Sequence, residues 1–265
     1  MSFPRIDALI ALAGSKGPHD YFSRQLIESS RTILAADGGV GALADLGYRP
    51  HMLVGDMDSL PASYPQEGPG NEAIIRFPLD KDYTDGELAT AAAVLLAAGS
   101  SVQDPVFKEN DGGQALYRAF QETPLAGLTL AYLNFAGFRY DHALANINLA
   151  ALLAQRGAQV FLSDGTSLAR LLTGPGQLEP VFPGPVFDEA RQKAPRTNFH
   201  FSLLPLSDQV TGLTLRGLKW ELDKVDLPPG RSLTLSNRAL GLYPDQATLS
   251  LDRGTVMALA FPEGL

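Results

Sequence analysis

Three short apolar segments in the first third of the chain each run into acidic residues. The segments and the residues that follow them are 32–36 with Asp37, 51–54 with Asp56 and Asp58, and 73–77 with Asp82 and Asp85. Short apolar runs bounded by turn residues are typical of buried strands. In an open α/β fold the carboxyl ends of parallel strands meet at one edge of the sheet, where ligands bind. The pattern therefore predicts an α/β fold with an acidic crevice along that edge.

Two of these runs hold carboxylates close together, and this spacing favours a cation site. Like charges this close repel one another and resist burial, so folded proteins usually keep them where a cation neutralises them. Carboxylates at i and i+2, here Asp56 and Asp58, can both reach one Mg²⁺, and Asp85 can add a third ligand from another strand end. We therefore predict a magnesium site with Asp56, Asp58 and Asp85 as ligands. Solvated turns are the alternative for both runs, and Asp82 in particular suits solvent.

A fourth apolar segment, residues 129–135, is followed by Arg139, Asp141 and His142 and adds a cation to the same edge. The planar fork of Arg139 and the point charge of Lys81 both suit triphosphate oxygens. Two alternatives stay open: Lys81 as a surface charge, and Arg139 with Asp141 as a structural ion pair. The sequence contains no strong general base, since a histidine that opens a helix, such as His142, is more often a cap or packing residue.

Residues 84–98 form the clearest helix pattern. Thr84 fits the N-cap, Glu87 three residues later completes a capping box, and Gly99 ends the helix. Asp85 would then lie in the first turn, where the helix dipole favours an anion, so capping alone also explains that residue. The apolar stretch of this helix is too short to span a bilayer.

The remaining pattern divides the chain into two regions. The other expected helices are 21–29, 40–46 and 141–156, and the other expected strands of this half are 6–13 and 160–162. Beyond them come short strand-like segments separated by turns, which predict a β-sandwich: 200–204, 212–215, 232–235, 247–251 and 256–260. The predicted fold is an α/β domain with a mostly parallel Rossmann-like sheet, residues 1–174, followed by an all-β sandwich, residues 175–265.

Two segments are interpreted as insertions. Residues 100–125 are rich in turn residues and predict a loop with at most one short helix around 115–120. Residues 181–197 are rich in proline and charge. We expect surface elaboration for both, although loops of this length sometimes act as lids.

Seven motifs occur in an order that resembles the thiamine pyrophosphokinase family. They span residues 36–39, 55–59, 81–85, 137–148, 201–207, 217–222 and 236–238. That family moves a pyrophosphoryl group from ATP to the hydroxyethyl oxygen of thiamine. The resemblance therefore implies ATP as co-substrate, Mg²⁺ as cofactor, an ATP- and magnesium-binding catalytic domain at 1–174 and a thiamine-binding domain at 175–265.

The resemblance also assigns roles to residues. The catalytic residues it implies are Asp56, Asp58, Asp85 and Arg139. The ATP-binding residues it implies are Asp37, Lys81, Asp82, Thr84, Arg139, Asp141 and His142. The substrate-binding residues it implies are Trp220, Ser236 and Asn237, which would reach thiamine across a homodimer interface from the partner's β-sandwich.

Thiamine carries a cationic thiazolium ring, so its pocket should contain an aromatic face. Trp220 fits this need, with a place in the core as its alternative, because tryptophan is highly buried on average. Arg238 stands where the family more usually has glutamate, and its role stays open. The glycine-containing turn at residues 14–17 lacks the spacing of a P-loop and is a weak candidate for a nucleotide contact.

Composition excludes some classes of function. A chain of 265 residues, 45% of them apolar, can bury one large core or two smaller ones. The net charge of −8 argues against a nucleic-acid surface, which needs clustered lysine and arginine. Cysteine is absent and the first residues lack the pattern of a signal peptide, so we expect a cytoplasmic enzyme with no membrane partner.

Three hypotheses stay open at this point. The first is thiamine pyrophosphokinase activity, and the second is a pyrophosphokinase of the same fold that acts on another alcohol, such as a hydroxymethylpterin. The third is a nucleotide- or thiamine-binding protein without catalysis. A substrate panel separates the first two, and release of AMP from ATP, Mg²⁺ and thiamine separates both enzymes from the third.

Overall fold

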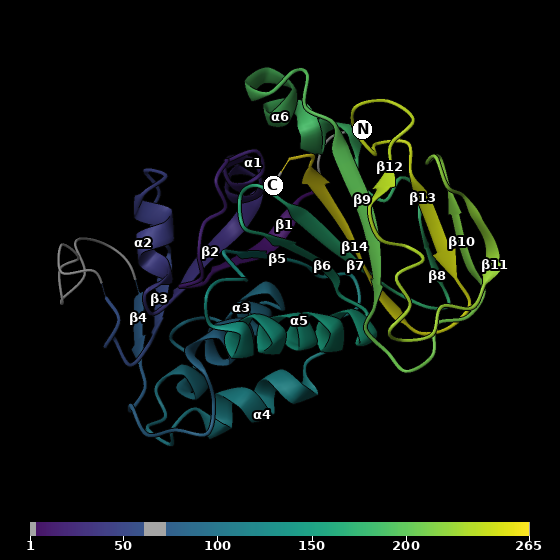
Figure 1. Cartoon of the computed structure of the whole chain (residues 1–265). Helices are drawn as coiled ribbons and strands as arrows, with labels where there is room; N and C mark the ends of the chain where they lie inside the picture. The colour runs from purple at the N-terminus through teal and green to yellow at the C-terminus, as the bar shows by residue number, and fades with distance from the viewer. Residues whose placement is uncertain (1–3, 61–72, 265) are drawn as a thin grey trace.

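The structure is a computed structural model that describes residues 4–60 and 73–264. Its first half builds a parallel sheet whose strands are β1 (Ile6–Ala11), β2 (Ser30–Ala36), β3 (Met52–Gly55), β4 (Ala73–Arg76), β5 (Thr129–Leu133) and β6 (Gln159–Ser163). These strands lie in the order β4-β3-β2-β1-β5-β6, each parallel to its neighbours (Figure 1). The apolar runs that predicted this sheet are mostly buried, because helices cover both of its faces.

Helices pack on the two faces of this sheet. Helices α1 (Ser23–Glu28) and α2 (Gly39–Ala44) cover one face, α3 (Asp85–Ala97) and α5 (Tyr140–Gln155) cover the other, and α4 (Gln114–Glu122) packs on α3. Alternate residues of β1 join two separate cores, Leu9 with α1 and α2 and Ile10 with α3, α4 and α5. The capping box that the sequence predicts at the start of α3 is present, with Glu87 N–H donating to Thr84 Oγ1 at 3.2 Å.

The large sheet then continues in antiparallel fashion. Its further strands, in spatial order after β6, are β7 (Leu168–Thr173), β14 (Thr255–Pro262), β9 (Phe199–Pro205) and β12 (Asn237–Arg238). A smaller antiparallel sheet follows the order β11 (Leu222–Val225), β10 (Leu213–Arg216), β13 (Thr248–Leu251) and β8 (Gly176–Leu178). The predicted fold class, a mostly parallel α/β region followed by an antiparallel β region, is confirmed.

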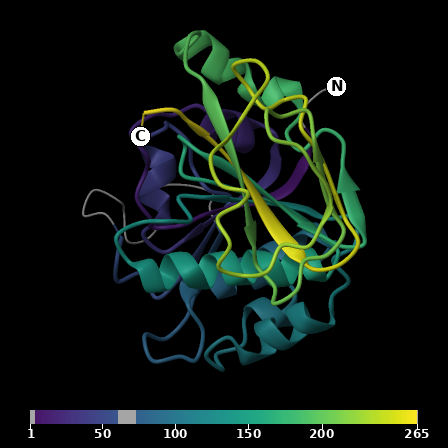
Figure 2. The same ribbon diagram turned by 45° about the vertical axis from the view of Figure 1, so that its right-hand side comes forward.

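The junction of the two regions lies within one continuous sheet. Strand β7 pairs with β6 on one side and with β14 on the other. No strand was expected at these residues from the sequence. Helix α5 lies against β6, β7 and β14, so it crosses from the parallel to the antiparallel strands (Figures 1 and 2). The domain boundary at residue 174 stays a prediction.

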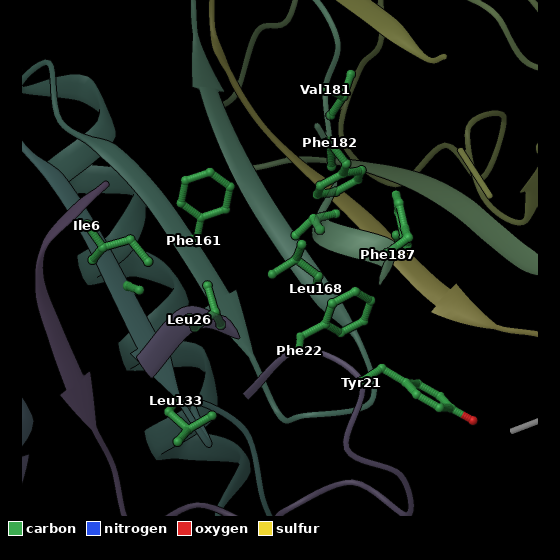
Figure 3. Packing of buried hydrophobic residues seen from close by; sticks show 14 of the residues in the cluster. Ile6, Tyr21, Phe22, Leu26, Leu133, Phe161, Leu168, Val181, Phe182 and Phe187 are labelled. Atoms are coloured by element: carbon green, nitrogen blue, oxygen red, sulfur yellow. The ribbon is translucent and has the colours of Figure 1, made fainter. Parts of the chain in front are cut away.

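Residues 181–197 are not surface elaboration, and that expectation was wrong. The segment contains η2 (Gly184–Phe187) and α6 (Asp188–Lys193), and Phe182 and Phe187 are fully buried. Figure 3 shows both rings beside Phe22 and Leu168, and the ring centroids of Phe22 and Phe187 lie 5.9 Å apart. The reason is apolar burial: aromatic side chains within a proline-rich stretch fill the core between α1 and the antiparallel strands.

The strand expected at residues 232–235 is also wrong. This stretch forms a turn, in which Leu235 N–H donates to the Ser232 carbonyl at 3.1 Å. Thr234 contacts β9 through hydrogen bonds to Leu203. Its hydroxyl donates to the Leu203 carbonyl at 2.7 Å, and its carbonyl accepts from Leu203 N–H at 3.0 Å. Apolar and β-branched composition favoured a strand here, but local turn bonds prevail. Among the described residues, no helix is long and apolar enough to cross a membrane.

Candidate active site

A cleft of about 520 Å³ opens at the carboxyl ends of β1, β2, β3 and β5, beside the first turns of α3 and α5. This is the edge at which the sequence predicts a crevice. The cleft is lined by these residues of the predicted site: Asp37, Asp56, Asp58, Thr84, Asp85, Arg139 and His142. Side chains as far apart in sequence as Asp37 and His142 thus converge, as the topology of parallel strands requires.

Three carboxylates of the cleft form a compact group. Asp37, Asp56 and Asp58 each offer one oxygen, and these oxygens lie within 4.8 Å of one another. Asp37 is buried and its Oδ1 accepts no hydrogen bond, while Asp58 is exposed toward solvent. Hard divalent cations prefer carboxylate oxygens, and an unpartnered buried carboxylate oxygen is costly without one. The donor set therefore fits Mg²⁺, with Asp37 in a place that the sequence analysis had given to nucleotide binding.

Lys81 and Asp85 lie beside this group. The ammonium nitrogen of Lys81 donates to Asp56 Oδ2 at 2.7 Å and forms an ion pair with Asp85 Oδ1 at 3.2 Å. Its side chain is 5% exposed, so the alternative of a surface charge is wrong. Asp85 Oδ1 is buried, and the Lys81 ammonium at 3.2 Å is the positive charge that it faces in the structure.

Burial and charge divide the acidic residues into two kinds. Burial raises the pKa of Asp37 and of Asp85, the latter in spite of Lys81. Burial alone would also raise the pKa of Asp56, but hydrogen bonds from Lys81 and from Asp58 N–H outweigh it, and the pKa is lowered. Burial would lower the pKa of Lys81, yet its carboxylate neighbours raise it overall. At Asp85 burial thus outweighs the charge of Lys81, whereas at Asp56 the hydrogen bonds outweigh burial.

The backbone of β2 and β3 brings the carboxylates together. Gly55 ends β3 with a φ of +148°, and a Cβ at this position would lie 3.0 Å from both Asp37 Cβ and Asp85 Cγ. Two non-glycine residues at the same strand ends, Asp37 and Met57, have φ values of +43° and +69°. Conformations of this kind cluster at functional sites, where the surrounding structure enforces them. Glycine at position 55 therefore permits the close approach of Asp37 and Asp85.

Arg139 lines the cleft and forms a solvent-exposed ion pair with Asp141. Its Nε and Nη2 donate to the two carboxylate oxygens of Asp141 at 3.0 and 2.7 Å, and the two side chains are 72% and 63% exposed. The hydrogen-bonded pairing lowers the pKa of Asp141 and raises that of Arg139. Exposed pairs contribute little stability, so Arg139 can exchange this partner for a ligand anion. Within the described chain, neither Asp82, which is exposed, nor Asp141 lines the cleft.

The cleft also contains residues that the sequence analysis missed. Phe138 and Asn146 line it, and the amide of Asn146 donates to the Phe135 carbonyl at 2.9 Å. The weak candidate turn contributes as well, since Gly14 and Ser15 line the same wall. An asparagine within a helix carries no sequence signal of its own, whereas small residues directly after a strand could have indicated this wall.

Trp220, Ser236 and Asn237 lie away from this cleft, since none of the three is among the residues that line it. Trp220 is 51% exposed, so its alternative place in the core is wrong, and the Lys219 ammonium lies 4.8 Å from its ring centroid. Asn237 is buried: its amide nitrogen donates to the Trp220 carbonyl at 2.7 Å, and its Oδ1 accepts from Trp220 N–H at 3.1 Å. Asn237 thus holds the backbone of Trp220. Ser236 is exposed with a φ of +55°.

The fold and the cleft define the class of protein: an α/β protein continued by antiparallel β sheets, with an acidic ligand site at the carboxyl edge of its parallel strands. Two family models match the chain, the catalytic domain of thiamin pyrophosphokinase over residues 23–162 and its vitamin B1 binding domain over residues 191–256. The chain belongs to the thiamin pyrophosphokinase family.

Solved structures agree with this fold. The thiamin pyrophosphokinase of Candida albicans superposes with a TM-score of 0.73 at 21% identity, covering 97% of this chain and 89% of the other. Yeast thiamin pyrophosphokinase gives a TM-score of 0.70 at 17% identity, covering 98% of this chain and 87% of the other. The Bacillus subtilis thiamine pyrophosphokinase gives a TM-score of 0.65 at 18% identity, covering 97% of this chain and 100% of the other. A sequence search of curated proteins gives no significant match.

Proposed function

We propose that the protein transfers the pyrophosphoryl group of ATP to the hydroxyethyl oxygen of thiamine, which yields thiamine diphosphate and AMP. Family membership supports the reaction. The observation that carries it is the group formed by Asp37, Asp56 and Asp58, whose carboxylate oxygens lie within 4.8 Å of one another in the cleft. Phosphoryl transfer depends on positioning and on charge stabilisation, and this cleft has groups for both.

Asp37, Asp56 and Asp58 would hold Mg²⁺, with Asp85 beside them as a further ligand. These carboxylates would place the positive charge of Mg²⁺ where it could stabilise charge that develops on the phosphate oxygens during transfer. Lys81 orients the oxygens of Asp56 and Asp85 through contacts of 2.7 and 3.2 Å. Because Lys81 is buried between these carboxylates and does not line the cleft, we assign it to the arrangement of the acidic group.

Arg139 binds the phosphate chain in this proposal. Its guanidinium offers a planar fork that matches two phosphate oxygens, and its partner Asp141 is exposed enough to release it. His142 and Thr84 also line the cleft, and we assign them to ATP binding. The attacking hydroxyl of thiamine would be oriented by Asp58 or Asp85, since the described part of the cleft presents carboxylates as its strongest acceptors.

The thiamine pocket is completed by a second subunit. Trp220 presents an exposed ring for the thiazolium and pyrimidine, and Asn237, which directly follows Ser236 in sequence, fixes the Trp220 backbone. Apolar side chains at the start of α5 are exposed, with Phe138 at 93%, which supports an interface there. The proposal therefore joins the ATP- and magnesium-binding part, residues 1–174, of one subunit to the thiamine-binding part, residues 175–265, of its partner in a homodimer.

Release of AMP tests the proposal. Purified protein mixed with ATP, Mg²⁺ and thiamine should form AMP and thiamine diphosphate in equal amounts, and chelation of Mg²⁺ should stop the reaction. Turnover of a hydroxymethylpterin in place of thiamine would favour the second hypothesis. Binding of both substrates without AMP would favour a binding protein.

A cytoplasmic location is also proposed, because a chain without cysteine has no need of an oxidising compartment.

A further inference from the structure

Residues 100–125, expected as a surface insertion, fold against the loop that carries Lys81. The segment contains η1 (Pro105–Phe107) and α4, which agrees with the short helix expected around 115–120. Helix α4 packs on α3, and its side chains Leu116 and Phe120 are 1% exposed. The segment is therefore part of the core beside the site.

An aromatic stack joins α4 to the Lys81 loop. The ring of Tyr117 in α4 lies on the ring of Tyr83, with centroids 4.4 Å apart and an interplanar angle of 25°. Tyr83 lies between Lys81 and Thr84, the N-cap of α3. Stacked aromatic pairs prefer defined arrangements and stabilise a fold by more than the apolar area they bury. The stack on Tyr117 should therefore restrict the movement of this loop.

The turn before α4 closes over the same loop. A Cβ at Gly112 would lie 3.9 Å from Lys81 Cβ, and a Cβ at Gly113 would lie 2.5 Å from Leu88 Cδ2. Both glycines have positive φ, +72° and +93°, which lets the turn approach this closely. The result is that the stem of Lys81 is enclosed and its side chain is 5% exposed.

The other end of α4 is fixed to α5. Arg156, the residue after α5, donates to the carbonyls of Phe120, Gln121 and Thr123 at 2.9, 3.0 and 2.8 Å. Its guanidinium also lies 4.7 Å from the Phe120 ring centroid, and Phe120 contacts the Tyr117 ring at 5.4 Å. These bonds satisfy the terminal carbonyls of α4 and hold Tyr117 in place.

We propose that Tyr117 is a positioning residue for Lys81. Its ring fixes Tyr83, and Tyr83 fixes the loop of residues 81–84, so that the Lys81 ammonium stays between Asp56 and Asp85. The catalytic part of this inference rests on the proposed function, whereas the structural part does not. A displacement of about 1 Å at a site of this kind can lower turnover by about a hundredfold.

Hydrogen exchange tests the structural part on the protein without ligands. Tyr117→Ala should speed exchange of the amides of residues 80–84, while Tyr117→Phe keeps the stack and should match the wild type. Arg118→Ala, at an exposed position one residue further along α4, is the matched control. Unchanged exchange in Tyr117→Ala would overturn the proposal. If this variant does not fold, Tyr117→Leu, which keeps the apolar contact with Phe120 but lacks the stack, takes its place.

Kinetics test the catalytic part. Tyr117→Ala should lower kcat/KM for ATP about tenfold and leave the KM for thiamine within about twofold, and in a Lys81→Met background it should cause no further loss. A rise in the KM for thiamine as large as the rise in the KM for ATP, or an undiminished loss without Lys81, would overturn action through Lys81. Absence of AMP with the wild type would instead contradict the proposed function, and hydrogen exchange would still decide the role of Tyr117.

Discussion

The acidic cleft and the surface around Trp220 hold their residues in different ways. Beside the cleft, the buried Lys81 ammonium joins half-buried carboxylates from separate strand ends, Asp56 at 2.7 Å and Asp85 at 3.2 Å. Trp220 is half exposed and is held through its backbone by one neighbouring amide, that of Asn237. The cleft is thus preorganised within one chain, whereas the Trp220 ring has a free face that a ligand or a second subunit can cover.

This difference leads to different expectations for substitution. A change in the cleft removes a charge from a group whose members depend on one another, so its effect on turnover should be large. A change at Trp220 removes one contact surface and leaves the remaining contacts intact, so its effect should be modest and confined to the substrate that stacks there.

Asp58→Asn should lower kcat at least about a hundredfold with little loss of stability. An amide is a poor ligand for a hard cation, and the substitution also removes one negative charge from the group. Asp58 is exposed and accepts a hydrogen bond from the Ser59 hydroxyl at 2.8 Å, which asparagine can also accept, so the fold should persist. A coupled AMP assay and a thermal melt measure the two effects together.

Asp80→Asn is the matched control for that experiment. Asp80 is an exposed carboxylate directly before Lys81 and does not line the cleft, and its substitution changes the net charge by the same amount. Its turnover should equal that of the wild type. Retained turnover of Asp58→Asn at ordinary Mg²⁺ would remove Asp58 from the metal site and would weaken the view that the carboxylates act as one group.

The cleft was the more predictable region, for a physical reason. Parallel strands deliver the residues after them to one edge, so Asp37, Asp56, Asp58 and Asp85 could be assigned to one crevice from the order of apolar runs alone. The capping box at Thr84 is similarly local and was confirmed. The sequence did not indicate which oxygens are closest, because that depends on the left-handed conformation of Asp37 and on the close approach at Gly55.

The antiparallel region was less predictable because its pairings depend on tertiary contacts. Strand β7 follows a tight turn and escaped detection, and residues 232–235 had strand composition but form a turn. The aromatic residues of 181–197 carried no pattern that distinguishes a core from a surface loop, and only packing shows Phe182 and Phe187 to be buried. Asn237 was predicted to contact substrate, and the structure occupies both of its amide groups with the Trp220 backbone.

Trp220→Ala should raise the KM for thiamine about five- to thirtyfold and leave the KM for ATP nearly unchanged, since loss of stacking on a cation costs about 1–2 kcal/mol. Lys219→Met is the companion variant, because the Lys219 ammonium occupies a face of the ring at 4.8 Å. Lys219→Met should not raise the KM for thiamine. Steady-state kinetics with each substrate varied separately measure both effects, and equal weakening of ATP and thiamine would indicate a structural role for the ring.

The smallest expected effect is a partial recovery of activity when two inactivated variants are mixed. This experiment tests whether the cleft and the Trp220 surface meet across subunits. Asp58→Asn inactivates the cleft and Trp220→Ala weakens the stacking surface, so in a mixed dimer one site would carry both defects and the other neither. With statistical exchange about half of the dimers are mixed, and each has one intact site of two, so about a quarter of wild-type activity should return at low thiamine. The residual activity of Trp220→Ala, measured separately, is subtracted. A monomeric elution profile, or no recovery despite demonstrated exchange of subunits, would mean that the cleft and the Trp220 surface serve one site within a single chain.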